Sequence, residues 1–133
     1  MKPKYLTLEE IEQCANNIVK EVDLSSTIRD KFRYLSAPLI CRYAYYTIAR
    51  EQMRNKTAKM HTLQDIGRRI GFDHATVHHG MSSLESLMKS KKTDVIDLVA
   101  RVRKECQEFY DKKYINEEIN KECKSLLIGL YAA

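Results

Sequence analysis

Three of the four histidines in this 133-residue chain stand within six positions of one another, at His74, His78 and His79. Histidines four residues apart on a helix have a spacing that zinc sites use. Here, however, no glutamate or cysteine stands at a recognised offset and the H-E-x-x-H pattern is absent. Positions 78 and 79 also diverge by about 100° around a helix. We therefore predict no metal site, and a histidine metal enzyme ranks last among the candidate functions.

Other patterns that carry chemistry are also absent. The cysteines form no C-x-x-C pair and fall on apolar helical stripes, so we expect reduced, packed thiols rather than disulfides or a catalytic thiol. These cysteines are Cys14, Cys41, Cys106 and Cys123. No G-x-x-x-x-G-K-[ST] loop occurs, which argues against nucleotide binding. We accordingly expect no cofactor, no bound nucleotide and no enzymatic activity.

The histidines belong to a segment, residues 62–84, whose pattern is typical of two short helices joined by a tight turn. Thr62 is suited to cap the first helix, and Gly71 stands where that helix should end with a positive φ. Gly67 would let the second helix approach closely, and Asp73 is suited to cap that helix. The expected buried stripe of the second helix is Val77, Met81, Leu84 and Met88.

In a helix–turn–helix unit, the N-terminal residues of the second helix reach base edges in the DNA major groove. The Asp73 carboxylate suits a cytosine amino group, His74 suits a purine edge, and the Ala75 methyl suits a thymine methyl. A second set suits phosphate, either through side chains or through free amides at the start of the first helix. These candidate phosphate contacts are Thr76, His79 and the amides around Leu63 and Gln64.

The rest of the chain predicts an all-α fold, a helix–turn–helix bundle of about six helices, because long apolar periods of 3.6 residues recur. Only two prolines and four glycines interrupt them. The expected caps of the other helices are Thr7, Ser36, Thr93 and Asn116. We expect one helical domain over residues 1–133, ending in a C-terminal helical extension, residues 106–133, as part of a hairpin. An exposed apolar face there would allow a homodimer; the alternative is that the hairpin folds back on its own core.

The net charge of +5 is unevenly distributed. Residues 29–69 hold ten Lys/Arg against three Asp/Glu, a local +7 that would attract phosphates, although a solvated basic surface is an equal alternative. Four tyrosines in this region suit base stacking or, as favoured for Tyr43 and Tyr46, packing at the rim of the core. They are Tyr34, Tyr43, Tyr45 and Tyr46. No apolar run approaches the ~20 residues of a membrane span. No signal-peptide pattern opens the chain, so we expect a cytoplasmic protein without a membrane partner.

The stretch IGRRIGFDHATVHHG resembles the signature I-G-x-x-F-G-G-R-D-H-T-T-V-x-H-A of the C-terminal DNA-binding domain of the bacterial replication initiator DnaA family. The matching residues are Ile66, Gly67, Gly71, Asp73, His74, Thr76, Val77 and His79. The preceding T-L-x-x-I-G and the I-A-R-E at 48–51 are similar to further family motifs, so the likeness covers roughly residues 14–105. Phe72 stands where the family has arginine, Ala75 replaces a threonine, and the ATPase module of the family is absent.

This resemblance implies a major-groove reader in which Asp73, His74 and Ala75 contact bases. It further implies that Arg33 enters the minor groove and that Arg42 binds phosphate. The expected partner is double-stranded DNA at a replication origin or a DnaA-box-like site. The alternatives are a small helix–turn–helix transcriptional regulator and a protein-binding adaptor that has lost DNA binding.

Overall fold

The computed structural model describes residues 6–32, 34–52 and 61–132, with side chains described as far as Ile115. Within these residues the chain forms five α-helices and no strand, as the sequence predicted for the fold class. The helices are α1 (Leu8–Val22), α2 (Ala37–Glu51), α3 (Leu63–Arg69), α4 (His74–Lys89) and α5 (Thr93–Ala132).

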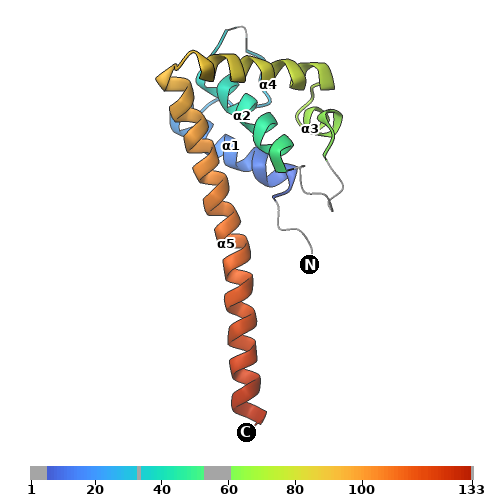
Figure 1. Cartoon of the computed structure of the whole chain (residues 1–133), viewed down its shortest axis with the longest axis vertical. Helices are drawn as coiled ribbons and strands as arrows, with labels where there is room; N and C mark the ends of the chain where they lie inside the picture. Colours follow the sequence, from blue (N-terminus) through green and yellow to red (C-terminus); the bar gives the residue numbers. More distant parts are fainter. Residues whose placement is uncertain (1–5, 33, 53–60, 133) are drawn as a thin grey trace.

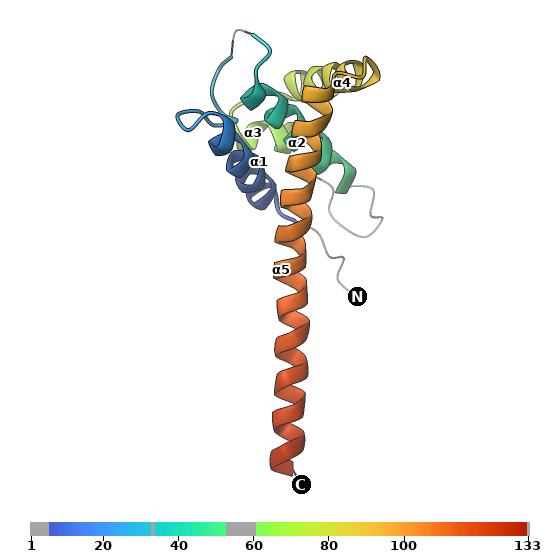
Figure 2. The same cartoon turned by 90° about the vertical axis from the view of Figure 1, so that its left-hand side faces the viewer.

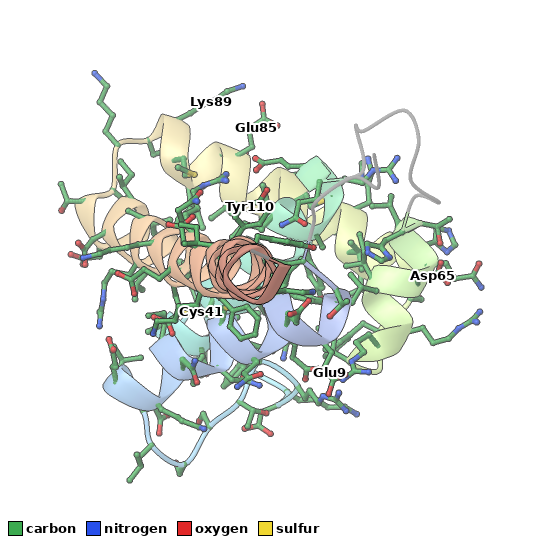
Figure 3. All side chains as sticks on the ribbon, turned by 90° about the horizontal axis from the view of Figure 1, so that it is seen from below. Glu9, Cys41, Asp65, Glu85, Lys89 and Tyr110 are labelled. Atoms are coloured by element: carbon green, nitrogen blue, oxygen red, sulfur yellow. The ribbon has the colours of Figure 1, made fainter. Side chains whose placement is uncertain are left out.

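The helices share one buried core. α1, α2 and the first part of α5 pack against one another, α4 crosses α2, and α3 lies against α4 (Figure 1). The core is apolar and draws on every helix; its members include Ile11, Val19, Ala44, Ile66, Val77 and Val99. In the view along α5, α4 lies on one side of that helix and α1 on the other (Figure 3). The first part of α5 is therefore part of the core rather than an appendage.

Helix starts follow the predicted caps closely. The Thr7 hydroxyl accepts a hydrogen bond from the Glu10 amide and the Glu10 carboxylate accepts one from the Thr7 amide, which completes a capping box. Ser36 caps α2, with proline in the first turn, and Thr62 caps α3. Thr93 differs from the prediction, because it is the first residue of α5 rather than the residue before it.

The predicted C-terminal hairpin is wrong. α5 is one helix of 40 residues that passes through Asn116 without a break. Neither glycine nor proline occurs between Thr93 and Ile128, and asparagine inside a helix costs only a few tenths of a kcal/mol, about 0.7 at most. An ion pair of 2.8 Å between Lys113 and Glu10 ties α5 to α1. Beyond it the helix continues away from the other four helices (Figures 1 and 2).

No helix in the part of the chain that the structure describes has the length and apolarity needed to cross a membrane.

Candidate nucleic-acid interface

The turn between α3 and α4 is fixed by two glycines. A Cβ added at Gly67 would lie 2.5 Å from the Phe72 carbonyl oxygen and 2.8 Å from Val77 Cγ2, so only glycine permits this approach of the two helices. Gly71 has φ +86°, which is the left-handed conformation that ends α3. Both roles were predicted from the sequence, and together they set the direction in which α4 begins.

The first two turns of α4 are polar and exposed on one side. Asp73 caps the helix, and its carboxylate accepts a hydrogen bond of 2.8 Å from the Thr76 amide. Hydrogen bonds from Thr76 hold the pKa of the Asp73 carboxyl below its ordinary value, so this group is an anion at neutral pH. The α4 side chains predicted to contact bases or phosphate are all exposed; they are His74, Ala75, Thr76 and His79.

The opposite side of α4 is buried. Val77 and Leu84 enter the core, and Gly80 lies so close to α2 that an added Cβ would be 2.8 Å from the Tyr46 ring. α4 is therefore held along its length by α2, while its N-terminal end stays open. This is the geometry that a groove-reading helix needs, because its first turn must protrude beyond the supporting helices.

A shallow recess of about 320 Å³ lies beside this end, between α3 and the start of α4. It is lined by Gln64, Arg68, Gly71, Phe72, Asp73 and His74. Arg68 is a candidate contact that the sequence interpretation missed. Its position four residues after Gln64 places both side chains on one face of α3, and that spacing was the available signal. Arg68 is exposed and has no ion-pair partner among the described residues.

Arg69, the next residue, is partly exposed, but its guanidinium pairs with a carboxylate of the protein. Glu12 of α1 is buried, and its carboxylate accepts hydrogen bonds from Arg69 Nε (3.1 Å) and from Arg29 Nη2 (2.9 Å) and Nε (2.5 Å). Burial would raise the pKa of the Glu12 carboxyl, but the hydrogen bonds from the two arginines outweigh it and hold that pKa below its ordinary value. Glu12 thus joins α1, α3 and the loop after α1.

Arg42 is not the surface phosphate contact that the resemblance implied. Its side chain is buried, with 5% of the residue exposed. Its guanidinium donates hydrogen bonds to the backbone carbonyls of Ile28 and Asp30 and lies against the rings of Phe32 and Phe72. Desolvation by burial lowers the pKa of this guanidinium. A phosphate cannot reach a group enclosed in this way, so the prediction for Arg42 is corrected.

Three predicted DNA contacts remain, one near the loop after α1 and two at the start of α3. Arg33 lies outside the described residues. Leu63 is half-buried and Gln64 is exposed at the start of α3. Figure 3 shows Asp65 of the same helix directed away from the other helices.

The tyrosines divide between core and surface. Tyr45 and Tyr46 are fully buried, Tyr43 is half-buried, and Tyr34 is 78% exposed. Tyr43 therefore lies at the rim of the core, as favoured from the sequence, whereas Tyr46 lies deeper than that prediction. Of these four tyrosines, Tyr34 is the one exposed enough to stack on an external ring.

The histidines form no metal centre with the described residues, among which no group of three potential ligands is found. His78 points to a different flank from His74, where it lines an open groove of about 700 Å³ between α2, α4 and α5. Cys14, Cys41 and Cys106 are buried free thiols.

Comparison of the chain with protein-family models, with curated proteins and with solved structures finds no match.

Proposed function

We propose that this protein binds double-stranded DNA in a sequence-specific manner and without catalysis, by inserting the N-terminal end of α4 into the major groove. The observation that carries the proposal is the open first turn of α4. His74, Ala75 and Thr76 are exposed there, while Val77 anchors the same turn in the core. In this proposal His74 and Ala75 meet base edges, with Asp73 beside them.

Phosphate contacts flank this reading end. Thr76 and His79 face solvent on α4, and Arg68 and Gln64 face it across the recess on α3. A guanidinium, an imidazole, a hydroxyl and an amide suit phosphate oxygens, and such contacts set the register of a protein on the duplex. The amides of Leu63 and Gln64 and the side chain of Arg33 remain part of the proposal as further contacts.

The resemblance to the DnaA family favours an origin or DnaA-box-like site in the cytoplasm of a bacterium or its phage, and hence a role in replication initiation. A small transcriptional regulator would use the same surface. Selection from a random duplex library separates these uses. Recovery of an asymmetric box similar to the initiator's site supports replication, whereas a palindrome supports a dimeric regulator.

The site itself is tested by His74→Ala, for which we expect a loss of about 1–3 kcal/mol in discrimination between the selected and a scrambled duplex. His78→Ala is the matched control, because it removes the same side chain from the flank that lines the groove beside α2. Equal discrimination by both variants would contradict the assignment of the reading end. Fluorescence anisotropy with the two duplexes measures the difference.

A protein-binding adaptor is the second candidate, and one observation favours it. Phe72 replaces a family arginine and Arg42 is buried, so two cations expected at a DNA surface are absent from it. An adaptor would bind no duplex even at low salt, where phosphate attraction is strongest. Failure to bind any duplex at about 20 mM salt would therefore replace the first proposal with this one.

We also propose a homodimer through α5, now as a pairing of single helices rather than of hairpins. An isolated helix of fewer than about 12–15 residues is marginal in water. The stretch of α5 beyond Ile115 is only slightly longer than that, so packing against a second copy would stabilise it. Sedimentation velocity at rising protein concentration tests this. A monomer throughout the range would refute it.

A further inference from the structure

Three segments of the chain meet at the Arg42 guanidinium. Arg42 belongs to α2, and its Nε donates a hydrogen bond of 2.5 Å to the carbonyl oxygen of Ile28. Its Nη2 donates to the carbonyl oxygen of Asp30. Both acceptors lie in the loop between α1 and α2, so one side chain of α2 holds the turn of residues 27–30 at two of its carbonyl groups.

Two aromatic rings complete the surroundings of this group. The guanidinium carbon lies 5.3 Å from the centroid of the Phe32 ring and 4.3 Å from that of Phe72. Both distances fall within the range of about 6 Å in which a cation is attracted to a ring face. Phe32 comes from the same loop, whereas Phe72 is the residue directly before Asp73, the cap of α4.

Carbonyl groups and rings, rather than a carboxylate, contact the Arg42 guanidinium among the described residues. Among the described residues no carboxylate lies within ion-pair distance of it, and the Asp30 side chain instead accepts from the Thr27 amide. Burying a cation is costly unless hydrogen bonds and rings stabilise it. A neutral side chain of similar size would fill the same space, so packing alone does not account for an arginine here. The fork of donors and the flat ring-stacking surface are what this position uses.

We propose that Arg42 is a positioning residue that locks the loop of residues 27–32 and the start of α4 into one DNA-facing arrangement. This inference rests on the proposed function and refines it. Arg42 touches no DNA itself. Through Phe72 it fixes where the cap of α4 lies, and through Ile28 and Asp30 it fixes the loop that carries the exposed Lys31. The loop and the reading end of α4 then meet the duplex together.

The same inference gives a reason for Phe72. A second arginine at that position would bring a like charge to the Arg42 guanidinium, whereas a ring attracts it. Arg42 and Phe72 therefore form a pair, in which one side chain is buried because the other is aromatic.

Arg42→Lys tests the inference, because lysine keeps the charge but has neither the fork of donors nor the planar surface. We expect discrimination between the selected and a scrambled duplex to fall by about 5- to 150-fold, as for a lost base contact. The slope of log Kd against log salt should stay unchanged, because no phosphate contact is removed. Phe72→Leu should reproduce this result if both residues act through the same contact.

Arg68→Ala is the matched control, since it removes an exposed arginine close to the same turn. Its salt slope should fall by about 0.9, the value for one phosphate contact, while discrimination is kept. Arg42→Met, which removes the charge, separates a direct phosphate contact from the positioning role. A slope that falls by about 0.9 in Arg42→Met, with slope and discrimination both retained in Arg42→Lys, would show a direct phosphate contact and overturn the positioning role.

Amide hydrogen exchange keeps the inference testable without DNA. In folded Arg42→Lys, exchange should quicken at residues 28–32 and 71–74 together and stay unchanged in α1, because both segments lose the same support. Quickening of only one segment, or of neither, would refute the inference even if the protein binds no duplex. If Arg42→Lys does not fold, the same measurement on Phe72→Leu decides. A chain that shows the coupled exchange but binds no duplex refutes the proposed function alone.

Discussion

Cations on the two flanks of the turn before α4 have opposite surroundings. One flank is made by α1, α2 and the loop between them, and we call it the inner flank. There Arg29 binds the buried Glu12 carboxylate, and Arg42 is enclosed by carbonyls and rings. On the other flank, made by α3 and called the outer flank, Arg68 is exposed beside the recess that borders His74. Arg69 follows it directly in sequence but turns back to Glu12.

The difference teaches that a local excess of positive charge does not measure a binding surface. Residues 29–69 carry +7, yet Arg29, Arg42 and Arg69 among them are bound by partners within the protein. Those three position the loop and α3, and we propose that the open cations beside them act on the duplex. Substitutions on the inner flank should therefore change stability or, at Arg42, discrimination between duplexes, without changing the salt slope, and those on the outer flank should lower the salt slope.

Gly67→Ala should give the largest effect, because it disrupts the close contact between α3 and α4 that supports the outer flank. The new Cβ would lie 2.5 Å from a backbone oxygen, which cannot move away as a flexible side chain could. We expect a loss of about 3 kcal/mol in the free energy of unfolding, measured by denaturant titration. Gly71→Ala is the control, with open space but a φ of +86°, and should lose about 1 kcal/mol. Equal losses would contradict the close α3–α4 contact.

Glu12→Gln should be next, because it breaks the inner flank. The Glu12 side chain is 8% exposed, but Arg29 and Arg69 are 48% and 37% exposed, so water compensates part of the lost pairing. We expect a loss of about 2 kcal/mol at pH 7, with duplex affinity lowered only through stability. A loss of salt slope equal to that of an outer-flank variant would remove the distinction between the flanks.

The pH dependence of the same variant gives a second measurement. The pKa of Glu12 is lower in the folded protein than its ordinary value of 4.5, so its contribution is complete above that value. That contribution disappears as the pH falls through the lower folded pKa. Between about pH 5 and pH 3 the wild type should therefore lose more stability than Glu12→Gln. Parallel curves would mean that the carboxylate is not stabilised by its arginines.

Much of the fold followed from local patterns, and the failures have physical reasons. Capping residues such as Thr7 and Asp73 act on amides three positions away, so the sequence alone located those helix starts. The hairpin failed because Asn116 resembled a cap, although no glycine or proline was present to end the helix before it. Helix continuation depends on many weak preferences, which a single polar residue does not override.

The candidate site divides in the same way. Exposure of His74 and burial of Val77 follow from helical register and were predicted. The burial of Arg42 depends on contacts with Phe32 and Phe72. Phe32 lies in the loop before α2, and Phe72 lies in the turn before α4, so neither belongs to the helix that carries Arg42. No spacing rule within one element identifies such a contact, and the family resemblance suggested the opposite.

Two neighbouring tyrosines offer a smaller test of the inner flank. The Tyr45 hydroxyl donates a hydrogen bond of 2.9 Å to the Ile66 carbonyl and ties α2 to α3, whereas the buried Tyr46 hydroxyl has no partner among the described residues. Tyr45→Phe should cost about 1 kcal/mol in unfolding free energy, and Tyr46→Phe should cost nothing or stabilise. Thermal melts of both variants measure this, and a larger loss for Tyr46→Phe would reverse the assignment.

The smallest effect, and the most direct test of the two flanks, comes from Arg68 and Arg69. Arg68→Ala should remove one phosphate contact, which lowers the salt slope by about 0.9 and leaves stability unchanged. Between 50 and 200 mM salt, that slope difference corresponds to about a threefold change in relative affinity. Arg69→Ala should leave the slope unchanged but lower stability, because Glu12 loses a partner. If the two variants have the same slope and the same stability, the adjacent arginines of α3 do not differ in their partners, and the outer flank carries no phosphate contact at Arg68.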